Sequence, residues 1–165
     1  MEKPNVGGKV RFLSGVPANV QIQQNTNTDT TIAAMRKMVH DYYGDLAEYA
    51  DWTLDDFFDL VKNLPYKMEE VGWGAQILQR PNFTLRRLVP VVACANKAIL
   101  ISSFLTMHGI KNGFVVTANS KNANFSHVFN WAEFGNSGVK VFIDATYPQN
   151  VIYREKVYPK RKVYP

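Results

Sequence analysis

The order of the predicted elements indicates an α+β fold. Amphipathic helical patterns come first, an apolar helix follows near the middle of the chain, and the last part of the sequence has strand-like patterns. A Gly-Asn-Ser-Gly turn at 135–138 joins the last two strands, which is typical of an antiparallel hairpin. Helices that precede an antiparallel sheet, instead of alternating with strands, are typical of the α+β class.

The composition is that of one globular domain. The chain has 165 residues, 46% of them hydrophobic and 13% aromatic, which is enough to bury a core. The longest apolar run is shorter than the ~20 residues that a membrane-spanning helix needs. The N-terminal residues lack the apolar stretch of a secretory signal. We therefore expect no membrane span and no secretion signal, and a location in the cytoplasm of the producing cell.

Three segments are expected along the chain. Residues 1–27 form an irregular N-terminal lead-in with only "VRFL" and "VQIQ" resembling strands, and residues 28–152 form the domain. Residues 153–165, "YREKVYPKRKVYP", form a basic extended C-terminal tail, because proline excludes a helix. We interpret this tail as solvated. No specific nucleic-acid contact is expected, since the sequence has no glycine-rich phosphate loop or aromatic-and-basic sheet motif.

Two helices are predicted before the middle of the chain. Apolar residues recur at helical spacing over 28–43. In the second helix, Thr53 and Asp56 resemble a capping box and Pro65 stops the helix. Its apolar stripe consists of Leu54, Phe57, Phe58, Val61 and Leu64. Residues 67–90 are interpreted as a long connection, which is usually functional or partly structured at this length.

The central helix begins at Cys94 and ends before Gly109, a typical C′ glycine. It is apolar on nearly every side, which predicts a buried central helix. We expect Ile101, Phe104 and Leu105 to pack this helix against the sheet.

The pairing of the last two strands sets the relation between two polar side chains. If Phe134 lies opposite Val139, then Asp144 lies opposite Phe129. His127 and Asp144 then share a face of the sheet as diagonal neighbours, with backbones ~7–8 Å apart. An imidazole and a carboxylate can form a hydrogen bond across that separation, so we expect the two side chains to be in contact.

These positions favour a thiol nucleophile. Cys94 is the only cysteine, so it cannot form an internal disulfide or build a thiolate zinc site, and no metal or cofactor is expected. A helix N-terminus and an imidazolium both stabilise a thiolate. The candidate catalytic residues are therefore Cys94, His127 and Asp144, with Asp144 orienting the imidazole. Each alone has a structural interpretation, as a packed thiol, a strand histidine or a turn cap, but the three placements agree with one mechanism.

The sequence also resembles a known family. Cys94 with "KAILISSFLTMHGI", "SHVFNWAEF" and "VFIDATYP" is similar to the transglutaminase-like superfamily of cysteine enzymes, with a Cys that opens a helix, a His-apolar-aromatic strand and Asp-Ala-Thr on the next strand. The resemblance covers about Thr53 to Asn150. The upstream segment "LPYKMEE…LQRPNFTLRR" is similar to the substrate-side segment of the short microbial or phage-encoded members. It implies a papain/transglutaminase-like core, in which the helix opened by Cys94 packs on an antiparallel sheet after the preceding helices.

The family resemblance implies a function and leaves an alternative. Members usually carry Gly-Asp-Cys-Asp or Gly-Gln-Cys-Trp, whereas this chain has "VACAN", which favours hydrolysis over protein cross-linking. The implied activity is that of a cysteine-dependent amide or peptide hydrolase, or acyl transferase, that forms a thioester acyl-enzyme. The substrate would be a protein or peptide, such as a peptidoglycan stem peptide. The alternative is a non-catalytic scaffold or assembly component, for example in a phage virion, where the protein would be virion-associated.

Overall fold

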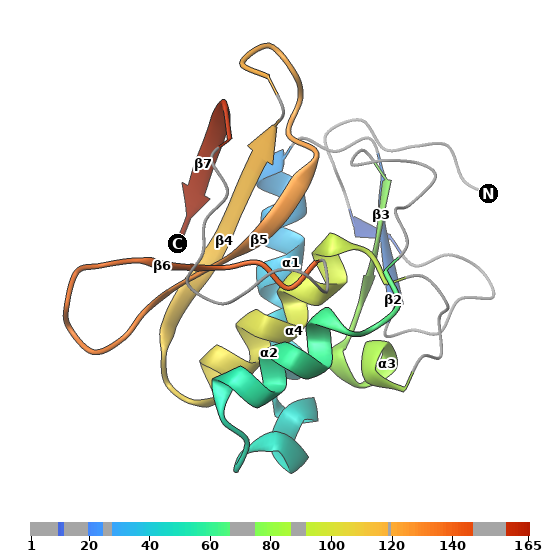
Figure 1. Cartoon of the computed structure of the whole chain (residues 1–165). Coiled ribbons are helices and arrows are strands. Elements are labelled where there is room, and N and C mark those ends of the chain that lie inside the picture. The colour runs from blue at the N-terminus through green and yellow to red at the C-terminus, as the bar shows by residue number, and fades with distance from the viewer. Residues whose placement is uncertain are drawn as a thin grey trace.

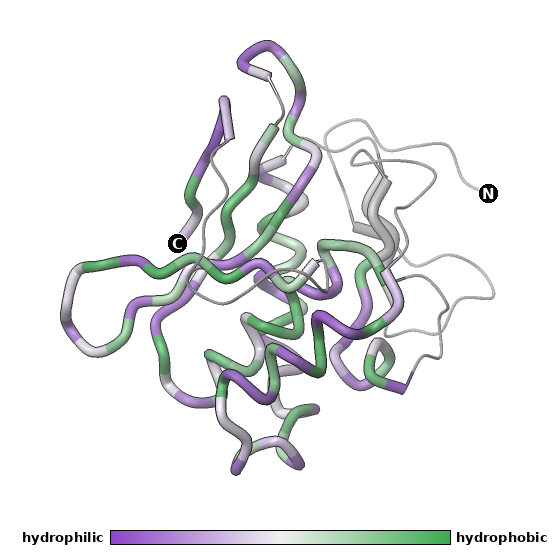
Figure 2. The backbone as a smooth tube through the Cα atoms, viewed as in Figure 1, coloured by the Kyte–Doolittle hydropathy of each residue, from purple (hydrophilic) through white to green (hydrophobic). Residues whose placement is uncertain are grey.

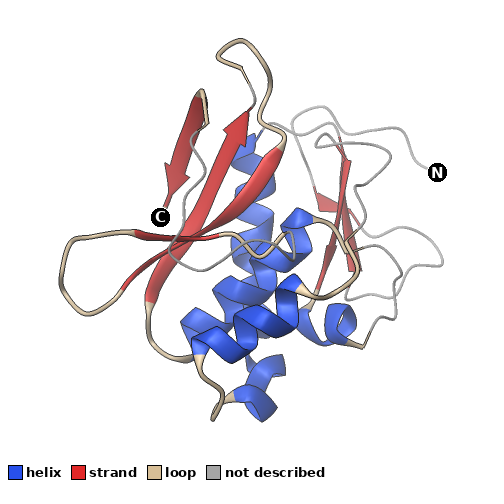
Figure 3. Cartoon of the chain, viewed as in Figure 1, coloured by secondary structure: helices blue, strands red, loops and turns tan. Residues whose placement is uncertain are grey.

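The computed structural model describes residues 10–11, 20–24, 28–66, 75–86, 92–118, 120–146 and 158–165. Helices pack against one face of an antiparallel sheet, and a smaller sheet lies on the far side of these helices (Figures 1 and 3). This mixed arrangement confirms the predicted α+β class.

The described part of the chain contains four α-helices and one 3-10 helix. They are α1 (Thr28–Tyr42), the 3-10 helix η1 (Tyr43–Tyr49), α2 (Leu54–Lys62), α3 (Pro81–Leu85) and α4 (Cys94–Met107).

The described strands form two antiparallel sheets. The larger sheet has the order β6-β5-β4-β7, and the smaller has the order β1-β2-β3. The larger sheet contains β4 (Lys111–Ala118), β5 (His127–Glu133), β6 (Val141–Ile143) and β7 (Lys160–Tyr164). The smaller sheet contains β1 (Val10–Arg11), β2 (Val20–Gln24) and β3 (Ala75–Gln79).

The signals that begin and end the helices act as the sequence predicts. The Thr53 hydroxyl accepts a hydrogen bond from the Asp56 N–H at 3.1 Å, which satisfies one of the free amides at the start of α2. Helix α4 ends with His108 as its C-cap, and Gly109 follows with φ of 70°. Only glycine adopts this backbone conformation without steric cost, so Gly109 turns the chain toward β4.

Helix α4 is the centre of the fold. Every residue from Cys94 to Leu105 is buried, and hydrophobic residues dominate this helix in Figure 2. One side of α4, with Ala95, Ala98 and Ile99, packs against α1 and the inner face of β4 and β5. The other side, with Ile101, Phe104 and Leu105, packs mainly against α2 and η1 and also contacts the sheet. The expected sheet contact of these three residues is therefore the smaller part of their packing.

The predicted register of β5 and β6 is confirmed. Asn130 pairs with Ile143 and Trp131 with Phe142, as the sequence analysis requires. Regular pairing ends at Ala132 and Val141, so the connection is longer than the predicted turn of residues 135–138. Gly135 and Gly138 have φ of 66° and 72°, and they reverse the chain within this longer connection without shifting the register.

Three segments differ from the sequence predictions. The interpretation of the C-terminal residues as a solvated tail is wrong for β7, which forms an edge strand along β4. Part of the lead-in forms β2, and the connection expected over 67–90 contains β3 and α3. The strand-like stretches "VRFL" and "VQIQ" do contain β1 and β2. The partners of β3 and β7 lie far away in the sequence, so local patterns could not reveal these two strands.

Gly113 permits the contact that ties β7 to the sheet. The indole Nε1 of Trp131 donates to the backbone oxygen of Tyr164, and a Cβ at Gly113 would collide with both groups. We predict that Gly113→Ala lowers the free energy of unfolding by about 1–3 kcal/mol, the usual cost of overpacking. Urea unfolding measures this change. Gly44→Ala is the matched control because a Cβ there meets no atom within 4 Å; equal effects of the two substitutions would contradict the prediction.

Candidate active site

Cys94 is the first residue of α4, as the sequence analysis predicts. The preceding residue, Ala93, is extended, with φ of −95° and ψ of 175°, so the chain turns into the helix at the cysteine. The first amides of a helix have no partner within it and carry the positive end of the helix dipole. The thiol is therefore held where a negative sulfur would be stabilised, although only 7% of the residue is exposed.

His127 and Asp144 come together from neighbouring strands. His127 is the first residue of β5, and Asp144 directly follows β6. Nε2 of His127 lies 2.8 Å from Oδ2 of Asp144, and the two side chains are 15% and 14% exposed. The expected contact between these side chains is therefore present, and it results from the register of the hairpin.

The Cys94 side chain is close enough to the His127 ring to raise the pKa of that ring. The structure thus brings the three residues that the sequence analysis selected into one group, in which the His127 ring contacts the Asp144 carboxylate. Strand β5, which begins at His127, packs directly on α4, which begins at Cys94.

The two members of the buried pair are both charged at neutral pH. Burial lowers the pKa of His127, but hydrogen bonds with Asp144 and Cys94 outweigh this effect and raise the pKa to about 10. Burial raises the pKa of Asp144, but the contact with His127 and hydrogen bonds from Thr146 hold it below its ordinary value. The ring is therefore an imidazolium beside a carboxylate.

Aromatic rings surround the His127 imidazole. The ring centroids of Phe129 and Tyr158 lie 5.7 Å and 6.2 Å from that of His127, and these two rings stack on each other 6.1 Å apart. Apolar neighbours of this kind reduce the access of water to the ion pair and strengthen its attraction. Tyr158 lies just before β7, so the C-terminal segment contributes to the surroundings of the site.

Sequence reasoning missed Lys97 and Tyr158. Lys97 is 1% exposed, and its Nζ donates to the backbone oxygens of Lys62 and Thr146. The available signal was a single charged residue within an otherwise apolar helix, one turn after the cysteine. For Tyr158 the signal was weaker, because only the repeated "KVYP" distinguished the tail.

The segment before α4 lies beside its first turns. The N–H of Gln79, at the end of β3, donates to Oδ1 of Asn96 at 2.9 Å. This contact places the described part of the segment that resembles the family's substrate side next to the helix that carries Cys94. The sequence around the cysteine, "VACAN", differs from the usual pattern of the family. The residues directly before it, 87–91, lie outside the described residues.

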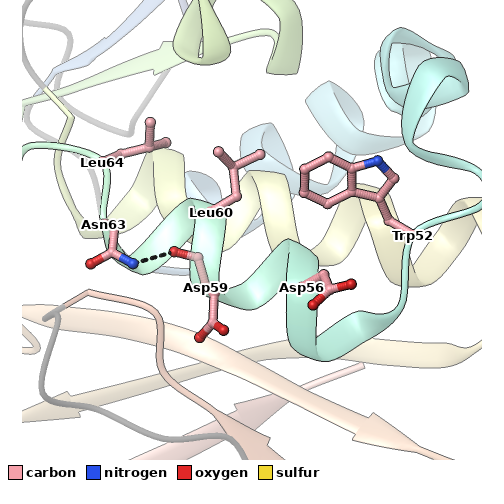
Figure 4. Close-up of a pocket in the computed structure, with 6 residues that line it drawn as sticks. All are labelled: Trp52, Asp56, Asp59, Leu60, Asn63 and Leu64. Carbon is pink, nitrogen blue, oxygen red and sulfur yellow. Dashed lines mark hydrogen bonds between the residues drawn. The ribbon is translucent and has the colours of Figure 1, made fainter.

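A pocket on α2 is separate from these residues. Its volume is about 400 Å³, and Figure 4 shows its lining. It is lined by Trp52, Asp56, Asp59, Leu60, Asn63 and Leu64. It shares no residue with the Cys94 group. Within the described part of the chain, no three His, Cys, Asp or Glu side chains form a group that could hold a metal ion, and no helix there is long and apolar enough to cross a membrane.

Comparisons with known proteins return little. No family model and no curated protein matches the sequence. Among solved structures, the chain is similar to Legionella pneumophila LapG (EGTA-treated), with 15% identity over 80% of this chain and 78% of that chain, and a TM-score of 0.48. At this identity and TM-score the similarity assigns no function, so the functional assignment depends on the side-chain geometry.

We predict that the His127 ring keeps its proton to about pH 10, because the Asp144 carboxylate stabilises the imidazolium. Asp144→Asn removes that charge and should lower the pKa of His127. Nitrogen chemical shifts of the ring across pH 5–11 measure both values, and the spectrum of His127→Gln assigns the signal. A ring that titrates at the same pH in wild type and Asp144→Asn would contradict this prediction.

The same pair makes stability depend on pH. The folded-state pKa of His127 lies above its ordinary value of 6.5, so its contribution to stability is complete below about pH 6.5 and is lost as the pH rises through about 10. We predict that the stability advantage of wild type over Asp144→Asn shrinks between pH 6 and pH 10. Urea unfolding at several pH values measures this difference; a constant or growing advantage would be inconsistent with the pair.

Proposed function

We propose that this protein is a cysteine-dependent amide or peptide hydrolase, or an acyl transferase, of the transglutaminase-like type. The observation that carries the proposal is the contact between His127 and Asp144 at 2.8 Å, with Cys94 close enough to the same ring to raise its pKa. A thiol at a helix start, beside an imidazolium that a carboxylate holds, is the arrangement that generates a nucleophilic thiolate.

The proposed reaction has two steps. The Cys94 sulfur attacks the carbonyl carbon of an amide, and His127 gives its proton to the departing amine, which leaves a thioester on the enzyme. A water molecule then loses a proton to the neutral His127 and attacks the thioester, which releases the acid and leaves Cys94 as a thiolate beside the protonated His127. Asp144 orients the imidazole and stabilises its charged form throughout. The backbone N–H of Cys94 would donate to the oxyanion of each tetrahedral intermediate.

The acyl acceptor decides between hydrolysis and transfer. Hydrolysis needs no site for a second substrate, and "VACAN" lacks the tryptophan that follows the cysteine in the cross-linking enzymes. We therefore favour water over an amine. The substrate class is a protein or peptide, and a peptidoglycan stem peptide is one candidate.

The alternative is a non-catalytic scaffold or assembly component of the same type. The observation in its favour is the burial of Cys94, which is only 7% exposed. Against it stands the buried His127–Asp144 pair beside the thiol. A scaffold has no physical need to bury two charged groups there, because an apolar pair of similar volume would often be as stable.

We predict that Cys94→Ser and His127→Ala each reduce turnover by roughly 1000-fold or more, because the first removes the nucleophile and the second removes the proton carrier. Asp144→Asn should cost less, because asparagine can still orient the imidazole. Double variants should show little further loss, since the three groups act as one unit. Turnover of a panel of peptide and glutamine-amide substrates measures these effects.

Controls separate catalysis from packing. His40→Ala removes an exposed histidine of α1 and should leave turnover unchanged, while unfolding curves of all variants test the fold. If wild type shows neither turnover nor a trapped thioester across the panel, the scaffold alternative replaces the enzyme proposal. If Cys94→Ser lowers stability by several kcal/mol and has no other effect, the thiol serves packing.

A further inference from the structure

Lys97 carries a buried ammonium group one helical turn after Cys94. The residue is 1% exposed, although lysine is almost never buried without partners. Residues three apart on a helix lie on the same side, so Lys97 and Cys94 share a side of α4. The mechanism proposed above does not use this group.

Two backbone carbonyls hold the ammonium. Nζ of Lys97 lies 3.1 Å from the oxygen of Lys62 and 3.0 Å from the oxygen of Thr146. Lys62 ends α2, and the last carbonyls of a helix lack partners within it and attract cations. The ring of Tyr66 also faces the ammonium, 5.9 Å from Nζ. Lys97 therefore joins the end of α2 to the backbone that follows β6.

The contact with Thr146 leads to the proposed site. The N–H of Thr146 donates to Oδ1 of Asp144 at 3.0 Å, and a further hydrogen bond comes from its side chain. The other carboxylate oxygen, Oδ2, contacts His127 at 2.8 Å. Thr146 thus accepts a hydrogen bond from Lys97 and, in turn, orients Asp144 toward the imidazole. The polar contacts run from α4 through Lys97, Thr146, Asp144 and His127 back to Cys94 on α4.

We propose that Lys97 is a positioning residue, whose ammonium fixes Thr146 and thereby holds Asp144 against His127. This inference rests on the proposed function, because it gives Lys97 a role in activating Cys94. It goes beyond that function in giving a role to a fourth side chain, whose ammonium contacts backbone oxygens.

The charge state of Lys97 is consistent with this role. Burial lowers its pKa to about 8, while the Asp144 carboxylate opposes that shift. The group is therefore mostly protonated at neutral pH. The titratable groups that face it are Asp144 and Tyr66, and His127 and Cys94 are linked to it through Asp144.

In Lys97→Met, the loss of positioning and the loss of charge would shift the pKa of His127 in opposite directions. Lys97→Met removes a positive charge near the imidazolium, and this loss by itself would raise the pKa of His127. Loss of positioning would instead release Thr146, weaken the contact between Asp144 and His127, and lower that pKa. A purely structural role would change stability and leave the pKa of His127 in place. The sign of the change therefore identifies the role.

The experiment compares wild type, Lys97→Met and Ser102→Ala. Ser102→Ala is the matched control, because it removes a partly buried hydrogen bond of the same helix, from Ser102 Oγ to Asn112 Oδ1 at 2.6 Å, away from Cys94. We expect Lys97→Met to lower the pKa of His127, measured from ring nitrogen shifts. It should also slow alkylation of Cys94 by iodoacetamide at pH 7 by roughly 10- to 100-fold, as expected for a displaced catalytic group. Ser102→Ala should change neither value.

The outcomes separate this inference from the proposed function. An unchanged or raised pKa of His127 in Lys97→Met overturns the inference, even if Cys94 remains reactive and turnover continues. If wild-type Cys94 reacts no faster than glutathione, the proposed function fails, while the His127 titration still tests the positioning role.

A measurement on wild type covers the case in which Lys97→Met does not fold. As Lys97 loses its proton near pH 8, its hydrogen bond to the backbone oxygen of Thr146 weakens. The amide shift of Thr146 and the Lys97 side-chain nitrogen shift should therefore titrate together. A Thr146 amide that does not respond to the Lys97 titration overturns the inference.

Discussion

The burial of α4 on every side is the constraint on which the rest of the structure depends. Burial makes the polar side chains of α4 depend on partners inside the protein, because an unpaired buried polar group is costly. Ser103 Oγ has no such partner among the described residues, whereas Asn96 and Lys97 do. Asn96 binds the backbone of β3, and Lys97 binds the backbone at the end of α2 and after β6. Asn130 of β5 donates to the carbonyl of Ala98. These contacts fix the neighbours of α4 around its first turns, where Cys94 lies.

The proposed site also has a simple charge balance. With Lys97 and His127 protonated and Asp144 ionised, the buried groups carry one net positive charge. An isolated charge inside a protein is costly, so an anion nearby would be stabilised. A thiolate at Cys94 would supply that anion, and so would the oxyanion of a reaction intermediate. The buried charges of Lys97, His127 and Asp144 would thus favour the negative charge that nucleophilic catalysis needs.

Much of this arrangement could be predicted from local patterns. The Thr53 cap, the glycine after α4 and the register of β5 and β6 follow from residues close together in sequence, and the structure confirms each of them. The register matters most, because strand side chains alternate between faces, and a slip of one residue would separate His127 from Asp144. The catalytic roles of these residues stay a prediction. The strand-like pattern of β2 was visible in the sequence, but the pairing of β2 with β3 and the strands β3 and β7 escaped prediction, because the partners are distant in the sequence.

The sequence by itself determined the α+β class, the position of the thiol at a helix start and the pairing that places an imidazole beside a carboxylate. Short-range physics suffices for these features, since caps, helical periodicity and hairpin register involve neighbouring residues. Only the tertiary structure decided what surrounds them. Lys97 meets carbonyls from α2 and from the backbone after β6, and Tyr158 lies beside His127. Such contacts join residues 35 to 49 positions apart for Lys97, and they exist only once the helix is buried between its neighbours.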